Sequence, residues 1–131
     1  MKNPTLPSDR GVRIAGTGSF TPDKLLTNDD LAQMVETSDE WITQRTGIKQ
    51  RRICEPGTEG TFSMAREALG RAIDDSGIDP KTLDLVIVGT VTPDMTCPST
   101  SARLTAEFGA TPAAAFDLSA ACCGFRSEEH T

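Results

Sequence analysis

Leu-Asp-Leu-Val-Ile-Val-Gly-Thr at residues 83–90 holds the longest apolar run of the chain and decides the expected fold. Unbroken apolar strands of this kind belong to sheets that are covered on both faces. The run stops at Gly89, well short of the roughly 20 apolar residues that a membrane span requires. We therefore expect a central strand and no membrane helix.

Helical patterns flank this strand on both sides. The preceding helix is predicted over residues 62–76, ends at Gly77, and has as its apolar face Ala65, Leu69, Ala72 and Ile73. The following helix is predicted over residues 98–108, with Gly109 as its end, and a second strand over residues 113–118. The order helix, strand, helix, strand predicts a right-handed α/β unit with a parallel pair of strands.

The first sixty residues predict shorter elements. Val12 to Ala15 has the pattern of a strand, and Gly16-Thr17-Gly18-Ser19 that of a flexible turn. A dinucleotide-binding motif would need a third glycine where Thr21 stands, so we reject that interpretation. Asn28 is the expected cap of a short amphipathic helix. A capping box at residues 37–40 then predicts a helix that ends at Gly47, followed by a strand over residues 48–54.

Composition limits the class of protein. The 131 residues are 37% hydrophobic and 24% charged, with a formal net charge of −6, which is typical of one soluble domain. The negative charge argues against unspecific binding to nucleic acid. Residues 1–10 are expected to be a flexible extension, because they contain no apolar stretch like that of a secretory signal.

Cysteine and histidine usage favours free thiols over a metal site. The four cysteines at positions 54, 97, 122 and 123 form no C-x-x-C pair, and His130 is the only histidine. We therefore expect no metal site and a reducing compartment, by default the cytoplasm.

The segment after residue 118 suggests a reactive thiol. Cys122 follows a strand and two alanines, and if it begins a helix, the free amides there would favour a thiolate and could bind an oxyanion. The alternative is a cysteine that only packs, which is common after a strand.

Four segments occur in the order and approximate spacing of one enzyme family: 16–19, 37–42, 45–48 and 120–125. With these segments, residues 11–125 resemble the amino-terminal part of β-ketoacyl-acyl-carrier-protein synthase III. The resemblance implies an incomplete thiolase-like fold, a layered α/β structure with a mixed sheet. It also implies an acyltransferase of fatty acid biosynthesis that forms a homodimer and binds no resident cofactor.

By this resemblance, Cys122 accepts an acyl group from acyl-CoA as a thioester, and the carbanion from malonyl-acyl carrier protein attacks it. The family also uses a His and an Asn, and His130 lacks the motif of that His. Trp41 resembles the residue that stacks on the CoA adenine, and Arg45 a contact to the nucleotide, with Thr37 and Thr46 nearby. Alternatively, Trp41 packs in the core and Arg45 pairs with a carboxylate.

Cys97 stands where relatives often carry a bulky aromatic residue that limits the pocket for the primer acyl group across the dimer interface. A smaller side chain leaves volume, so we expect tolerance for primers longer than acetyl; the alternative is a plain packing or interface cysteine.

The polar residues 126–131 do not resemble the family. The codons AGA TCG GAA GAG CAC ACG would encode them and resemble a sequencing adapter, so we expect a truncated gene model.

Three other functions stay open at this point. The first is a related thiolase-fold acyltransferase of secondary metabolism. The second is a non-catalytic CoA-binding module in which Cys122 only packs, and the third is a generic interaction domain without any positive feature in the sequence. As an isolated fragment, the chain is expected to be inactive.

Overall fold

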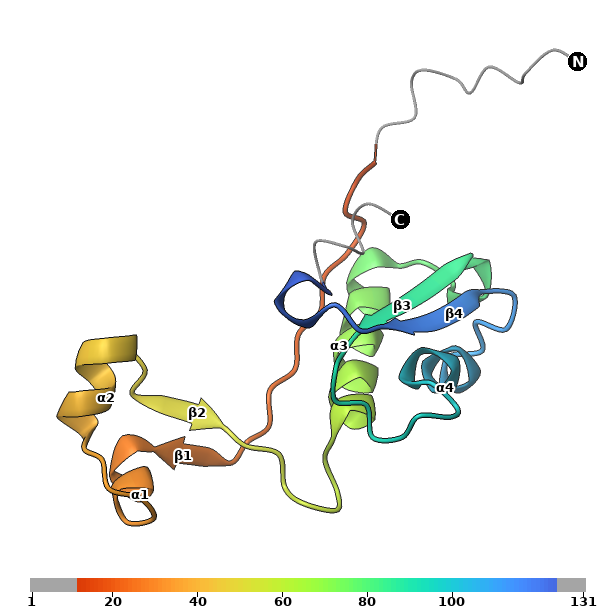
Figure 1. The fold of residues 1–131 in the computed structure, drawn as a ribbon. Helices are drawn as coiled ribbons and strands as arrows, with labels where there is room; N and C mark the ends of the chain where they lie inside the picture. Colours follow the sequence, from red (N-terminus) through yellow and green to blue (C-terminus); the bar gives the residue numbers. More distant parts are fainter. Residues whose placement is uncertain (1–11, 125–131) are drawn as a thin grey trace, which may run out of the picture.

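The computed structural model describes residues 12–124, so the predicted extension at 1–10 and the tail at 126–131 lie outside the described residues. Figure 1 shows two parts, a small unit formed by the first elements and an α/β unit formed by the later ones. The elements, in chain order, are β1 (Leu25–Thr27), α1 (Asn28–Ala32), α2 (Asp39–Thr46), β2 (Gln50–Arg52), α3 (Thr61–Ser76), the 3-10 turn η1 (Pro80–Thr82), β3 (Leu85–Gly89), α4 (Thr100–Glu107), β4 (Ala114–Leu118) and the 3-10 turn η2 (Ala121–Cys123).

The α/β unit confirms the predicted order of helix, strand, helix, strand. β3 and β4 pair in parallel, with Val86 opposite Ala115 and Val88 opposite Asp117. α4 packs against both strands and against α3. Within residues 12–124 the two strands have only each other as partners, so β3 does not lie between two strands there, as a central strand would.

The buried apolar core is small. Among the described residues, the buried apolar side chains of the α/β unit are Val86, Leu104 and Ala110. In the small unit the buried apolar side chain is Ile42 on α2. Leu85 and Phe116 on the paired strands remain 41% and 40% exposed. No helix within residues 12–124 has both the length and the apolar character needed to cross a bilayer.

In the small unit, β1 and β2 form an antiparallel pair, with Leu26 opposite Arg51. Its centre is Asn28, which is 1% exposed. The Asn28 Nδ2 atom donates hydrogen bonds to Asp39 Oδ1 and to the Ile48 carbonyl oxygen, both at 2.8 Å. Its Oδ1 atom accepts a bond of 3.0 Å from Arg51 Nη1. One buried amide therefore links α1, α2 and β2.

Two predicted helix caps are wrong by one residue. α1 is capped by Thr27, whose Oγ1 accepts from the Asp30 amide at 3.1 Å while Asp30 Oδ2 accepts from the Thr27 amide at 2.9 Å. This reciprocal pair leaves Asn28 free to turn inward. α2 is capped by Ser38, whose Oγ accepts from the Trp41 amide at 3.1 Å, and not by a box starting at Thr37. The predicted end at Gly47 is confirmed by its left-handed φ of 72°.

The predicted strand over residues 12–15 is also wrong. Val12 and Ile14 are 102% and 83% exposed, and the segment has no strand partner in the described part of the chain. The glycines that follow serve close packing on α3. A Cβ on Gly16 would lie 2.6 Å from the Ser76 nitrogen, and one on Gly18 would lie 2.5 Å from the Ala72 nitrogen.

Candidate active site

Cys122 lies in a sharply bent turn that follows β4. The bend is at Ala121, which has a φ of 45°, a left-handed conformation that costs a non-glycine residue roughly 1–2 kcal/mol. A hydrogen bond of 2.9 Å from the Cys123 amide to the Ala120 carbonyl oxygen closes the turn. Backbone strain of this kind is concentrated at functional sites.

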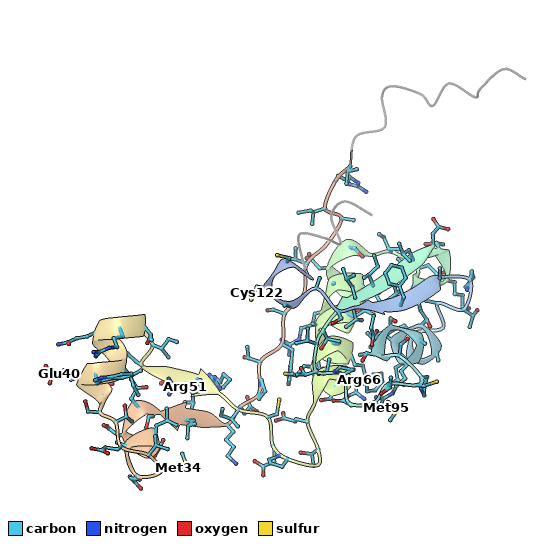
Figure 2. All side chains as sticks on the ribbon, viewed as in Figure 1. Met34, Glu40, Arg51, Arg66, Met95 and Cys122 are labelled. Carbon is cyan, nitrogen blue, oxygen red and sulfur yellow. The ribbon has the colours of Figure 1, made fainter. Side chains whose placement is uncertain are left out.

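This turn sits at the carboxyl ends of both parallel strands, as Figure 2 shows for the labelled Cys122. Gly124 is buried, and a Cβ added to it would lie 3.5 Å from the Gly89 Cα at the end of β3. The Thr90 amide donates to the Leu118 carbonyl oxygen at 3.1 Å and joins the two strand ends. In α/β proteins, ligands bind at this edge of the sheet.

The thiol of Cys122 is free and exposed among residues 12–124. Cys122 lies in the 3-10 turn η2, so the condition considered from the sequence, a helix that begins at Cys122, is not met by an α-helix. The backbone becomes helical at Gly124, with φ −50° and ψ −56°. Phe125, the last residue of the motif, lies outside the described residues.

Asp117 is a site residue that the sequence analysis did not single out. Its Oδ2 atom accepts from the Thr100 amide and its Oδ1 atom from the Ser101 amide, both at 2.8 Å. Burial favours the protonated carboxyl, but the hydrogen bonds from Ser101 and Thr100 outweigh burial and lower the pKa of Asp117. The ionised side chain therefore ties the start of α4 to the strand that leads to Cys122.

Trp41 and Arg45 form a stacked pair on α2, one helical turn apart. The Arg45 Cζ atom is 4.3 Å from the centroid of the indole ring, the geometry of a cation–π interaction. Trp41 is 52% exposed, which contradicts the alternative that it packs in the core. The pair therefore presents an aromatic surface and a positive charge together.

The two predicted threonines lie at the ends of α2. Thr37 is half-buried and directly precedes the cap. The Thr46 hydroxyl donates to the Ile42 carbonyl oxygen at 2.8 Å and accepts from the Ile48 amide at 3.1 Å. In this structure, the Thr46 hydroxyl therefore closes the helix end.

The structure does not bring all the predicted residues together. α2 belongs to the small unit, and Figure 1 shows it well apart from η2 in the α/β unit. The arginines on β2 have internal partners: Arg51 bonds to Asn28, and Arg52 Nη1 donates to the Asp23 carbonyl oxygen at 2.9 Å. The thiol and the Trp41–Arg45 pair are therefore two separate features.

Cys97 is exposed and lies on the segment between β3 and α4, residues 90–99, which we call the β3–α4 loop. A hollow of about 410 Å³ separates this loop from β4. Its lining includes Val91, Pro93 and Thr96 from the loop and Phe116 from β4.

Comparison with known proteins identifies close relatives. The chain is 56% identical over 112 residues to a β-ketoacyl-[acyl-carrier-protein] synthase III from Caldanaerobacter subterraneus subsp. tengcongensis, a match that covers 86% of this chain and 34% of that relative. The chain thus spans about a third of the length of the curated relatives it matches. No protein-family model matches the chain.

Solved structures agree with this similarity. The 3-oxoacyl-[acyl-carrier-protein] synthase III from Aquifex aeolicus matches with a TM-score of 0.87 and 45% identity, over 92% of this chain and 38% of that one. The priming β-ketosynthase of the R1128 polyketide pathway matches with a TM-score of 0.85 and 40% identity, over 89% of this chain and 35% of that one. The described residues are thus the amino-terminal part of a thiolase-like α/β fold, as predicted.

Proposed function

We propose that this chain, which by sequence and fold is the amino-terminal part of a β-ketoacyl-[acyl-carrier-protein] synthase III, contributes the acyl-accepting nucleophile of a condensing enzyme. The observation that supports this most directly is the exposed thiol of Cys122 on a strained turn, at the carboxyl ends of two parallel strands. A nucleophile needs both access to substrate and a fixed position.

The chemistry proceeds in two steps. The Cys122 thiolate attacks the thioester carbonyl of acyl-CoA, a carbon–sulfur bond forms, and the CoA thiolate leaves. Malonyl-acyl carrier protein then loses carbon dioxide, and the resulting carbanion attacks the enzyme-bound acyl group. A carbon–carbon bond forms and Cys122 leaves again as a thiolate, so the cysteine is regenerated. The His and Asn that assist the family's second step would come from outside this chain.

For the CoA nucleotide, we propose Trp41 and Arg45 as the contact. An exposed indole stacks on a flat base, and a guanidinium pairs with phosphate; the two groups already lie face to face at 4.3 Å. Thr37 and Thr46 flank the same helix and would border the nucleotide. Acyl-CoA is then a substrate and not a resident cofactor.

Location and assembly follow the same proposal. The four cysteines are free in the described residues, which suits a reducing compartment such as the cytoplasm. We propose that the full-length protein works there as a homodimer.

A second function is supported by one comparison. The polyketide priming ketosynthase matches over nearly the same share of the chain, with a TM-score of 0.85. A condensing enzyme of secondary metabolism would share the cysteine chemistry and differ in the acceptor and the product. The product of the condensation step therefore distinguishes the two functions.

The test is acyl labelling of the full-length protein. Incubation with acetyl-CoA or a longer acyl-CoA, followed by peptide mass spectrometry, should place one acyl group on the peptide that contains Cys122. The Cys122→Ala variant should lose the label, and the matched Cys123→Ala variant, one residue further along the same turn, should keep it. An unlabelled Cys122 in a protein that still binds CoA would instead indicate a non-catalytic module.

A further inference from the structure

The buried side chain of Asn28 holds both ends of α2. Its Nδ2 atom donates to Asp39 Oδ1, in the first turn of the helix, and to the Ile48 carbonyl oxygen, just beyond the last turn, both at 2.8 Å. The backbone amide of Asn28 also donates to the Lys49 carbonyl oxygen at 3.3 Å. The start and the end of α2 are therefore both fixed relative to α1.

The orientation of this side-chain amide is fixed by its partners. A carboxamide has two N–H donors, and Asp39 and Ile48 take both, while Thr43 Oγ1 lies 3.5 Å from the same nitrogen. The amide oxygen accepts from Arg51 Nη1 at 3.0 Å. Asp39 needs a donor and Arg51 needs an acceptor. Asparagine supplies both, whereas an ionised carboxylate of the same size has no donor.

Apolar packing contributes little to the position of α2. Among the eight described residues of this helix only Ile42 is buried, at 9% exposure. Asn28, in contrast, is 1% exposed. The loss of a hydrogen bond at such a site leaves a buried partner unsatisfied, which costs more free energy than the bond itself contributes. The position of α2 therefore depends mainly on the hydrogen bonds of Asn28.

These hydrogen bonds fix one face of α2 and leave the opposite face free. Asp39 and Thr43 lie one turn apart on the face toward Asn28, where the Thr43 hydroxyl also donates to Asp39 Oδ1 at 3.2 Å. Trp41 and Arg45 each follow one of them by two residues, which is about 200° around an α-helix. The stacked pair therefore lies on the opposite face, and a rotation of α2 about its axis would turn the pair with it.

We propose that Asn28 is a positioning residue for the CoA nucleotide, because it sets the angle at which α2 presents Trp41 and Arg45. This rests on the proposed function, in which these two side chains contact the nucleotide. Asn28 is buried and contacts no substrate, so it acts only through α2. Stacking on a base and pairing with a phosphate both depend on direction, and a helix that can rotate loses part of both.

The test uses the full-length enzyme and two acyl donors, one with the nucleotide and one without it. Acetyl-CoA carries the nucleotide, whereas acetyl-N-acetylcysteamine presents the same thioester on a short amide stem. Asn28→Asp keeps the acceptor for Arg51, loses both donors and places a second carboxylate beside Asp39. Its KM for acetyl-CoA should rise about tenfold, the factor that stacking of one base on an aromatic ring contributes to affinity. Its kcat/KM for acetyl-N-acetylcysteamine should change by less than about twofold.

Two further variants separate positioning from general damage. Asn28→Ala adds no charge and should also raise KM for acetyl-CoA alone. Thr27→Ala is the matched control, because it removes the cap of α1 beside Asn28 and no bond to α2; its KM for both donors should stay within about twofold of wild type. Equal losses with both donors in the two Asn28 variants, or an equal rise in Thr27→Ala, would show a role in stability alone and overturn the proposal.

Trp41→Ala tests the nucleotide contact itself and should raise KM for acetyl-CoA at least as much as Asn28→Asp does. If Trp41→Ala raises this KM and the Asn28 variants do not, the positioning role is overturned and the nucleotide contact stands. An unchanged KM in Trp41→Ala would overturn the contact and the positioning role together, while acyl labelling of Cys122 would still support the proposed function.

Discussion

Replacement of Asp117 by Asn is expected to destabilise the α/β unit by about 2–4 kcal/mol. The carboxylate accepts two hydrogen bonds of 2.8 Å from the amides of Thr100 and Ser101, and these two residues are 1% and 0% exposed. Asn offers one acceptor oxygen, so its NH₂ group has to face the second buried amide.

The magnitude follows from the lost interactions. A hydrogen bond to a charged group contributes about 1.5–3 kcal/mol. The negative charge beside the start of α4 adds about 0.3–1 kcal/mol through the helix dipole. Their sum is a large part of the about 5–15 kcal/mol that separates the folded and unfolded states of a typical domain.

The assay is urea unfolding of the 131-residue chain, followed by far-UV circular dichroism. With a slope of about 2 kcal/mol/M, the midpoint of Asp117→Asn should fall by about 1–2 M. The control is Asp74→Asn on the exposed side of α3, which should stay within about 0.5 kcal/mol of wild type. Equal midpoints for Asp117→Asn and wild type would refute the capping role.

The contribution of Asp117 to stability depends on pH with a defined sign. The hydrogen bonds lower the pKa of Asp117 in the folded state. Its contribution to stability is therefore complete above the pKa of the unfolded state, about 3.9, and is lost as the pH falls through the pKa of the folded state. The stability difference between wild type and Asp117→Asn should therefore be constant near neutrality and shrink in acid. A difference that persists far below pH 3.9 would contradict this assignment.

Three further substitutions test the packing. Gly18→Ala should lower the free energy of unfolding by about 1–3 kcal/mol in thermal melts, because the new methyl group meets the α3 backbone; an unchanged melt would contradict the close approach. Asn28→Ala should shift the unfolding transition seen by fluorescence of Trp41, the only tryptophan, by about 2 kcal/mol. Arg45→Ala should change Trp41 emission and reduce stability by about 1 kcal/mol or less; unaltered emission would exclude the stacked pair in solution.

The helices and the parallel pair were predictable because their signals are local. The apolar face of α3, its end at Gly77 and the apolar run of β3 each lie within a few consecutive residues. The exact helix starts were not predictable, since Thr27 and Asn28 both can cap and the choice depends on the reciprocal bond with Asp30. Adjacent polar residues compete for one cap, and a propensity scale does not separate them.

The strand predicted at residues 12–15 failed for a different reason. An alternating apolar pattern shows that a segment is able to form a strand. A strand exists only with a hydrogen-bonded partner strand, and the described residues supply none for this segment. In the site, the place of Cys122 after β4 was predictable from the strand and the small residues that follow. Asp117 in the site, and Asp94 at the start of α3, were missed because their partners lie 16–17 and 32–33 positions away, beyond the reach of any local pattern.

These two aspartates also impose an order on synthesis. Asp94 accepts from first-turn amides of α3, and Asp117 accepts from those of α4, which Ser99 also caps, so each helix leaves the ribosome before the carboxylate that completes its start. The first-turn amides of α3 must rely on water until translation has passed residue 94. Asp117 precedes Cys122 by only five residues, so the carboxylate that ties down α4 and the thiol of the reactive turn leave the ribosome almost together.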